Sequence, residues 1–215
     1  MCVNTPVAVI FDLGGVLVDY DFRRSFIATA HLTGLTPDEV RTRLFGNGGD
    51  FANYDGGRPI VDFECGRLSA PEFHVLTQKA LQCSFSFDVF CDLWNCIFTN
   101  EIQPTVDAAR ALRARGLKVG VLSNTNPIHF EFLRGRMPLL TELEHVFASH
   151  ELGCRKPDPE IFARVLARMA VAPARTVFVD DLVENIRAAQ AAGLQVIHAT
   201  DADAVQRGLR DLKLG

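Results

Sequence analysis

Short runs of apolar residues, rich in β-branched side chains, recur along the chain, and each ends in polar residues or glycine. They occupy residues 7–11, 117–122, 145–149, 176–180 and 194–199. Continuous apolar runs of this length are typical of parallel strands that are buried on both faces of a sheet. We therefore predict a parallel sheet built from these segments.

Helical patterns separate the later strands. Alanine and leucine recur at helical spacing in residues 104–116, which end at a glycine. Residues 158–170 begin with Asp158 and Pro159, a helix N-cap followed by proline in the first turn, and residues 182–193 again end at a glycine. This alternation of helices and strands predicts an α/β fold with a doubly wound, Rossmann-like parallel sheet.

Residues 20–99 follow a different pattern, with helical periodicity and no convincing strand. Helices are predicted at residues 22–32, 37–45, 71–82 and 86–98. The glycine-rich stretch 46–57 lacks a Gly-Lys-Ser/Thr sequence, so we interpret it as a loop between helices. We expect a core domain formed by residues 1–19 and 100–215, and an α-helical cap domain at 20–99 that is inserted after the first strand and covers one end of the sheet.

The composition is that of a globular protein without a basic surface. Of the 215 residues, 48% are hydrophobic and 22% charged, which suits a buried core, and the net charge is −4. The absence of a Lys/Arg cluster argues against nucleic acid and acidic membranes as partners. Neither a signal peptide nor a run of roughly 18 apolar residues is present. We expect a cytoplasmic monomer or homodimer with reduced cysteines.

Polar side chains collect where the predicted strands end, and ligands of open α/β sheets bind beyond the carboxyl ends of the strands. The residues at these positions are Asp12, Ser123-Asn124-Thr125-Asn126, Arg155-Lys156-Pro157 and Asp180-Asp181. Each group alone also fits a turn, a helix cap or a solvated surface charge. Their joint occurrence at strand ends and helix starts predicts one shared site.

Such a set of residues suits the transfer of a phosphoryl group to a carboxylate. Asp12 can attack phosphorus and form an aspartyl-phosphate, which divides hydrolysis into two easier steps. Because two anions repel each other, a hard cation must lie between them, and Mg²⁺ prefers carboxylate and carbonyl oxygens. Asp12, the carbonyl of Gly14 and Asp181 can supply part of its shell. Ser123, backbone N–H groups and Lys156 would hold the remaining phosphoryl oxygens.

These motifs, in this order, resemble those of the haloacid dehalogenase-like hydrolase superfamily. The matching residues are Phe11-Asp12-Leu13-Gly14-Gly15-Val16-Leu17, Val121-Leu122-Ser123-Asn124-Thr125-Asn126, Arg155-Lys156-Pro157 and Val179-Asp180-Asp181 followed by Asn185. The match covers nearly the whole chain, and the helical insert resembles the α-helical cap of that superfamily. Within it, the motifs are similar to bacterial glucose-1-phosphate-type phosphatases and to the phosphatase domain of mammalian epoxide hydrolases.

The resemblance implies a Mg²⁺-dependent phosphatase that hydrolyses small phosphorylated metabolites, with sugar phosphates as the expected class. The implied roles are nucleophile for Asp12, phosphate contact for Ser123 and Asn124, charge neutralisation for Lys156, metal carboxylate for Asp181 and water-mediated metal partner for Asp180. Asn185 lies where many relatives carry another acid. The cap would close over the organic part of the substrate and exclude water. Candidates for its inner surface are His31, Phe45, Phe51, Asn53, Tyr54, Arg58 and Trp94. For each of them, a place in the cap core or on the surface is a better explanation than a substrate contact.

Gly14 departs from the family's usual Asp-x-Asp pattern, in which the second acid protonates the leaving oxygen and then activates water. General acid–base catalysis contributes about 10²–10⁴-fold, whereas enzymes accelerate phosphate-monoester hydrolysis by up to about 10²¹-fold. We therefore expect the loss to weaken hydrolysis without abolishing it. Leaving groups that need little protonation, as in sugar 1-phosphates or acyl phosphates, should suffer least. Asp19, Asp21 or a cap residue is an alternative proton source. Asp19 and Asp21 lie where the chain leaves the core for the cap, and this position favours a hinge role for them.

Three other functions compete with a phosphatase. A dehalogenase of the same superfamily would attack carbon and need no Mg²⁺, so the pair Asp180-Asp181 argues against it. A phosphotransferase or mutase would have to return the phosphoryl group, which the missing acid at position 14 hinders. The joint presence of Asp12, Ser123, Lys156 and Asp181 argues against a non-catalytic binding protein of the same fold, but Gly14 keeps that alternative open. Phosphatase activity therefore accounts best for the set.

Overall fold

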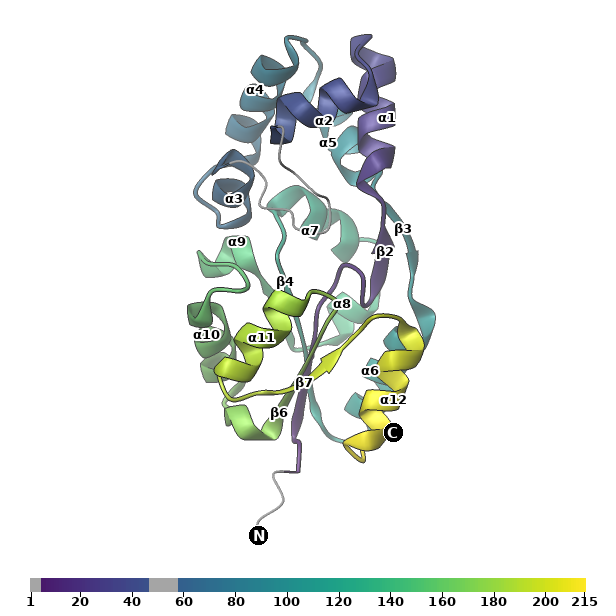
Figure 1. Cartoon of the computed structure of the whole chain (residues 1–215), viewed down its shortest axis with the longest axis vertical. Coiled ribbons are helices and arrows are strands. Elements are labelled where there is room, and N and C mark those ends of the chain that lie inside the picture. Colours follow the sequence, from purple (N-terminus) through teal and green to yellow (C-terminus); the bar gives the residue numbers. More distant parts are fainter. Residues whose placement is uncertain (1–4, 47–57) are drawn as a thin grey trace.

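The computed structural model describes residues 5–46 and 58–215, and its central feature is a five-stranded parallel sheet (Figure 1). The strands are β1 (Ala8–Phe11), β4 (Lys118–Ser123), β5 (His145–Ala148), β6 (Thr176–Asp180) and β7 (Gln195–His198), in the order β5-β4-β1-β6-β7. Each predicted strand is present with its ends displaced by no more than one residue. The predicted α/β fold with a doubly wound parallel sheet is confirmed.

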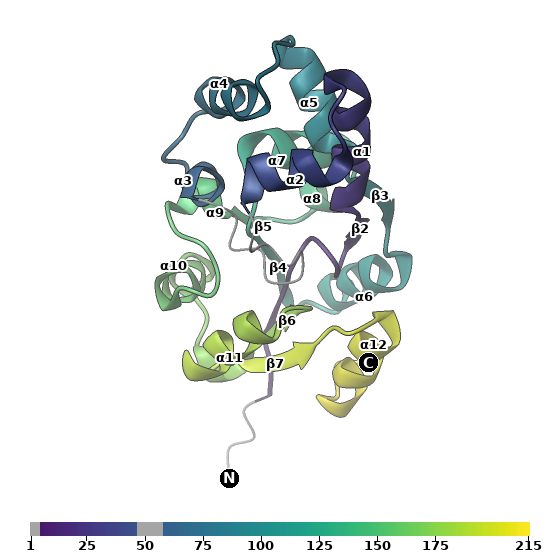
Figure 2. The same ribbon diagram turned by 45° about the horizontal axis from the view of Figure 1, so that its top comes forward.

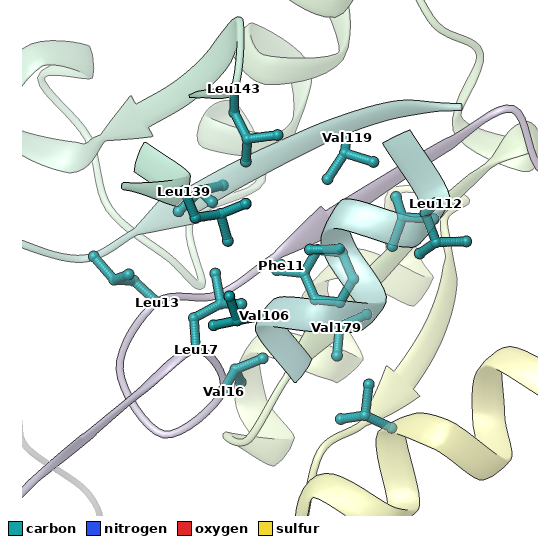
Figure 3. Packing of buried hydrophobic residues seen from close by; sticks show 14 of the residues in the cluster. Phe11, Leu13, Val16, Leu17, Val106, Leu112, Val119, Leu139, Leu143 and Val179 are labelled. Atoms are coloured by element: carbon teal, nitrogen blue, oxygen red, sulfur yellow. The ribbon is translucent and has the colours of Figure 1, made fainter. Parts of the chain in front are cut away.

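Helices cover both faces of the sheet because both faces are apolar. Val9 and Phe11 of β1 belong to one buried cluster, whereas Ala8 and Ile10 belong to a second one on the opposite face. The first face packs against α6 (Gln103–Ala114), α7 (Pro127–Arg134), α8 (Leu139–Glu142) and α12 (Ala202–Asp211), and the second against α9 (Ser149–Leu152), α10 (Pro159–Met169) and α11 (Val183–Ala191). Figure 3 shows Phe11 facing Val106 of α6 within the first cluster.

The strand register brings the polar strand ends to one edge. Phe11 lies opposite Val121 on one side and Val179 on the other. The residue after Phe11 therefore lies level with Leu122 and Asp180, at the carboxyl edge of the sheet. Parallel pairing with a common register is what turns separate sequence motifs into neighbours.

A second, two-stranded antiparallel sheet was not predicted. It consists of β2 (Val18–Tyr20) and β3 (Phe98–Glu101), with Tyr20 opposite Phe98. The two strands run between the large sheet and the helices that follow β2 (Figure 1). Strands this short carry too little periodicity to be recognised, and their partners are about eighty residues apart in the chain.

Helices α1 to α5 gather beyond the carboxyl edge of the sheet (Figures 1 and 2). Their bounds are α1 (Phe22–Thr33), α2 (Pro37–Phe45), α3 (Arg58–Glu64), α4 (Ala70–Leu81) and α5 (Phe87–Asn95). The predicted helix at 86–98 ends earlier because residue 98 enters β3, and α3 was not predicted. The stretch 47–57 lies outside the described residues. The cap boundary at 20–99 stays a prediction.

Within residues 5–46 and 58–215, no helix is long and apolar enough to span a membrane. The cytoplasmic location and the choice between monomer and homodimer stay predictions.

Candidate active site

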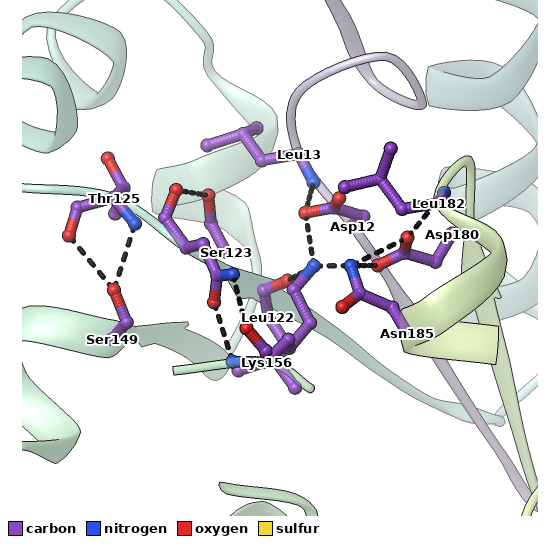
Figure 4. Close-up of polar contacts among 11 residues, drawn as sticks. Asp12, Leu13, Leu122, Ser123, Thr125, Ser149, Lys156, Asp180, Leu182 and Asn185 are labelled. Atoms are coloured by element: carbon purple, nitrogen blue, oxygen red, sulfur yellow. Dashed lines mark hydrogen bonds and ion pairs between the residues drawn. The ribbon is translucent and has the colours of Figure 1, made fainter. Parts of the chain in front are cut away.

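The ammonium group of Lys156 lies between two carboxylates at the carboxyl edge of the sheet (Figure 4). Its Nζ is 2.7 Å from Asp12 Oδ1 and 2.7 Å from Asp180 Oδ2, and it also donates to the carbonyl of Leu122 at 3.1 Å. Lys156 is only 1% exposed. Burial by itself lowers the pKa of Lys156, but Asp12 and Asp180 outweigh it and the net shift of the pKa is upward. The lysine is therefore a fixed buried cation.

Asp180 is fully buried and holds Lys156 in place. Its Oδ1 accepts a hydrogen bond from the N–H of Leu182 at 2.8 Å, and both of its oxygens accept from Asn185 Nδ2 at 3.0 and 3.1 Å. With Lys156 added, each Asp180 oxygen has at least two donors. Asn185 therefore supplies a donor to both oxygens of Asp180.

Asp12 follows β1 and presents its carboxylate beside this cation. Oδ1 accepts from Lys156 and from the N–H of Leu13 at 2.7 Å. Burial raises the pKa of the Asp12 carboxyl, Lys156 opposes that shift, and Asp180 and Asp181 add to it. These contacts engage Oδ1, so Oδ2 is the oxygen suited to attack an electrophile.

Asp181 completes a group of three acids. One carboxylate oxygen from each of Asp12, Asp180 and Asp181 lies within 4.8 Å of the others. Gly15 makes this approach possible: its φ is +74°, and a Cβ there would stand 2.5 Å from Asp181 Oδ2. Burial, followed by the charge of Asp180, raises the pKa of Asp181 to about 6. A cation bound beside Asp181 would stabilise the charged form of this carboxyl.

Ser123 and Asn124, at the end of β4, have different environments. Ser123 lines a cavity above Asp12 and its Oγ lies 3.5 Å from the carbonyl of Asn124. The Asn124 carboxamide forms two hydrogen bonds to the backbone of Lys156: Nδ2 donates to its carbonyl at 2.9 Å and Oδ1 accepts from its N–H at 2.8 Å. Asn124 thus ties the Lys156 loop to β4, and its backbone N–H remains the group suited to a phosphate.

The following loop is held by Ser149, which sequence reasoning did not single out. Ser149 Oγ accepts from the N–H of Thr125 at 2.9 Å and donates to its carbonyl at 3.0 Å (Figure 4). Asn126 then caps α7 by accepting from the N–H of His129 at 3.1 Å. No local pattern marks Ser149, since its role depends on β5 lying beside β4.

A cavity of about 750 Å³ opens above these residues. Its floor contains Asp12, Ser123, Lys156 and Asp181. Apolar side chains from the helical region, β3, the residue before β3 and α7 form much of the rest of the wall: Phe22, Ile60, Val61, Trp94, Ile97, Phe98 and Leu133. Arg155, Asp158, Glu184 and Arg187 add charged groups to it. Tyr20, Glu64 and His129 also line it, and none of these three was predicted.

Of the candidates predicted for the inner surface of the cap, Trp94 lines the cavity. His31 is exposed on α1, and Phe45 packs with Phe26 at a ring distance of 5.5 Å. Phe51, Asn53, Tyr54 and the side chain of Arg58 lie outside the described part of the chain. The two alternative proton donors, Asp19 and Asp21, do not line the cavity; Asp19 is exposed and Asp21 caps α1.

His129 joins the core to the helical region at the cavity wall. Its Nε2 donates to the carbonyl of Trp94 at 3.0 Å, its Nδ1 accepts from Asn126 Nδ2 at 3.1 Å, and its ring stacks on Trp94 at 5.5 Å. Burial lowers the pKa of His129 to about 4, against the hydrogen bond to Trp94. A second link is the ion pair of 3.3 Å between Arg155 of the core and Glu64 of α3. The helical region is thus fastened directly beside the floor residues.

Comparison with known proteins agrees with this geometry. A family model for haloacid dehalogenase-like hydrolases matches residues 7–193. The chain is 38% identical over 214 residues to a sesquiterpene phosphatase of Aspergillus oryzae, across 99% of this chain and 98% of that protein. It is 30% identical over 193 residues to a D-ribitol-5-phosphate phosphatase of Bacteroides thetaiotaomicron, across 87% of this chain and 88% of that protein. A haloacid dehalogenase family enzyme of the same bacterium, solved with magnesium and inorganic phosphate, has a TM-score of 0.74 at 25% identity, across 89% of this chain and 92% of that one.

Proposed function

Because the chain belongs to the haloacid dehalogenase-like hydrolase family and is a phosphoric monoester hydrolase, we propose that it is a Mg²⁺-dependent phosphatase acting through an aspartyl-phosphate on Asp12. The observation that carries this proposal is the position of Lys156 between Asp12 and Asp180 at the floor of the cavity. A buried cation beside a nucleophilic carboxylate attracts a phosphoryl dianion into a site that three acids would otherwise repel.

The carboxylates beside Asp12 fit Mg²⁺. Three carboxylate oxygens within 4.8 Å of one another form the hard donor set that this ion prefers. Asp12, Asp181 and the carbonyl of Gly14 would hold it, whereas Asp180, whose oxygens already accept several hydrogen bonds, would contact it through water. When bound, the ion offsets the negative charge of the transferred phosphoryl group.

The protein's own residues account for the two chemical steps. In the first, Asp12 Oδ2 forms a bond to phosphorus, and the leaving oxygen takes the electron pair of the bond that breaks. Lys156, Ser123 Oγ and the N–H of Asn124 would stabilise the phosphoryl oxygens. In the second, water attacks phosphorus, the Asp12–phosphorus bond breaks, and the carboxylate is restored as phosphate leaves.

The cavity wall favours a phosphate ester with a largely apolar organic part. Seven apolar side chains line the space above the floor, and each buried methylene of a ligand contributes about 0.8 kcal/mol. A relative named as a sesquiterpene phosphatase agrees with this choice. We therefore propose a prenyl-type monophosphate as the first substrate class to test.

Sugar phosphates are the second candidate. The missing acid at Gly14 favours good leaving groups such as a sugar 1-phosphate, and a relative is named as a D-ribitol-5-phosphate phosphatase. Glu64 and Arg155 in the cavity wall are the groups suited to sugar hydroxyls. A panel at equal concentration should rank a prenyl monophosphate first, a sugar 1-phosphate second and a sugar 6-phosphate last. A sugar phosphate ahead of the prenyl ester would contradict the apolar assignment.

Turnover of p-nitrophenyl phosphate tests the mechanism. We expect release of p-nitrophenol with Mg²⁺, little release with a chelator, and a loss of about 10⁴-fold or more in Asp12→Asn. Asp19→Asn is the matched control, because Asp19 is an exposed acid outside the cavity. Full activity of Asp12→Asn would refute the aspartyl-phosphate. Turnover of a haloacid in the presence of the chelator would favour the dehalogenase.

A further inference from the structure

The ring of Tyr20 fills the space beside Gly14. A Cβ on Gly14 would lie 3.0 Å from Cε1, 3.2 Å from Cδ1 and 4.0 Å from Cζ of Tyr20. The first of these is at the limit of contacts that real Cβ atoms make, so even alanine at position 14 would push the ring. An aspartate there, as in the usual family pattern, would compete with the phenol for the same volume.

The chain turns back sharply after Asp12, and this turn brings Tyr20 to Gly14. The N–H of Gly15 donates to the carbonyl of Val18 at 2.9 Å, and the N–H of Val18 donates to the carbonyl of Leu13 at 3.0 Å. Tyr20 then pairs with Phe98 across the small sheet. Its ring meets that of Phe22 edge-on at 5.2 Å. The phenol is therefore held by backbone pairing and packing.

The Tyr20 hydroxyl is a hydrogen-bond donor without an assigned acceptor. Tyr20 lines the cavity, and within the described residues its hydroxyl makes no hydrogen bond. The ordinary pKa of a tyrosine phenol is about 10, so the hydroxyl keeps its proton at neutral pH and can donate a hydrogen bond.

On the basis of the proposed phosphatase activity, we propose that Tyr20 takes the place of the acid absent at position 14 and donates a hydrogen bond to the leaving oxygen of the substrate. In the first step, the Asp12–phosphorus bond forms and the bond from phosphorus to the leaving oxygen breaks. The leaving oxygen keeps that electron pair, accepts the hydrogen bond from the phenol, and takes its proton from water. Tyr20 remains neutral throughout.

This role makes catalysis depend on the leaving group in a way that packing alone does not. An alkyl or prenyl oxygen develops a full negative charge and needs a donor, whereas p-nitrophenolate delocalises its charge and needs little help. Removal of one donor to a developing oxyanion costs about 10²–10³-fold in kcat. Tyr20→Phe removes the hydroxyl and keeps the ring that packs against Phe22 and Gly14.

The test is the kcat of Tyr20→Phe on a prenyl or alkyl monophosphate and on p-nitrophenyl phosphate. We expect a loss of about 10²-fold on the alkyl ester and a much smaller loss on the nitrophenyl ester. Equal losses on both esters would show a structural role, and no loss on either would show no role; each result overturns the proposal. Wild-type protein without Asp12-dependent turnover of either ester would refute the phosphatase itself, which is a different outcome.

Gly14→Ala provides an independent check of the contact between the two residues. In the wild-type background it should displace the phenol and reproduce the selective loss on alkyl esters. In the Tyr20→Phe background it should cost little more, because residues in contact give non-additive effects. Additive losses in the double variant would contradict the shared space. Circular dichroism and thermal unfolding of each variant would verify that the fold is kept.

Discussion

The floor and the wall of the cavity differ in how their residues are brought together. The floor residues Asp12, Ser123 and Asp181 belong to three neighbouring strands or follow them directly, so parallel pairing makes them neighbours. The wall residues come from the helical region, from β3 and from α7, and meet only through packing and the small sheet. The phosphate end of the site thus depends on the parallel sheet, whereas the space for the organic part of the substrate depends on how the helical region packs against the core.

The largest expected effect tests the floor. Lys156→Met should lower the free energy of unfolding by about 3–5 kcal/mol near neutral pH, since it leaves Asp12 and Asp180 buried without their cation. Urea unfolding measures the change. Lys118→Met is the matched control, because Lys118 is exposed and donates to one backbone carbonyl. An equal loss of stability in both variants would mean that the buried ion pairs contribute no more to stability than a surface lysine.

Acid should weaken the link between floor and wall. His129 has a pKa of about 4 in the folded protein against 6.5 in an unfolded chain. Below pH 6.5 the unfolded chain gains a proton that the folded one does not accept until about pH 4, so stability falls with pH across this window by about 3 kcal/mol. Unfolding measured from pH 7 to pH 4 should show this loss in wild type and a reduced one in His129→Gln. His31→Gln, at an exposed position, should behave as wild type; an unchanged profile in His129→Gln would contradict the assignment.

Metal binding should depend on pH through Asp181. Because its pKa is about 6 in the folded protein, protons compete with Mg²⁺ below that pH. Each unit by which the pH falls below 6 should weaken the apparent affinity for Mg²⁺ by about tenfold. Titration calorimetry at pH 5 and pH 7.5 measures the difference, and Asp181→Asn should bind weakly at both values. If the wild-type protein bound Mg²⁺ equally well at the two pH values, Asp181 would be excluded as a metal ligand that must lose its proton to bind.

The smallest effect concerns the wall alone. Ser69 and Glu72 form a reciprocal capping box at the start of α4, with Ser69 Oγ accepting from the N–H of Glu72. Ser69→Ala should lower the stability by about 1 kcal/mol and leave kcat on p-nitrophenyl phosphate unchanged, because the floor does not involve α4. Ser84→Ala, at an exposed position, should change neither quantity. A fall in kcat with Ser69→Ala would show that the two regions are coupled more tightly than their separate construction indicates.

Several site residues carried a local signal and others did not. Asp12 and Asp180 each end a run of buried apolar residues, which is visible in one dimension. Asn124 was also a candidate, and its role as a phosphate contact stays a prediction. Its carboxamide binds the backbone of Lys156, a detail that depends on how two loops meet. The sequence gives no local signal for Tyr20, because it lies in a strand of three residues whose partner strand is far away in the chain. Its contact with Gly14 exists only after the turn has formed.

The amino-acid order alone determined the parallel α/β core, the helical nature of the insert and the identity of the floor residues. Apolar periodicity is local, and a parallel sheet converts strand ends into neighbours by geometry common to all such folds. The tertiary structure decided the small sheet, the cavity wall, the burial of Lys156 and the position of a phenol where an acid was missing. These features arise from contacts between residues distant in sequence, and such contacts depend on side-chain volume and packing direction, which periodicity does not encode.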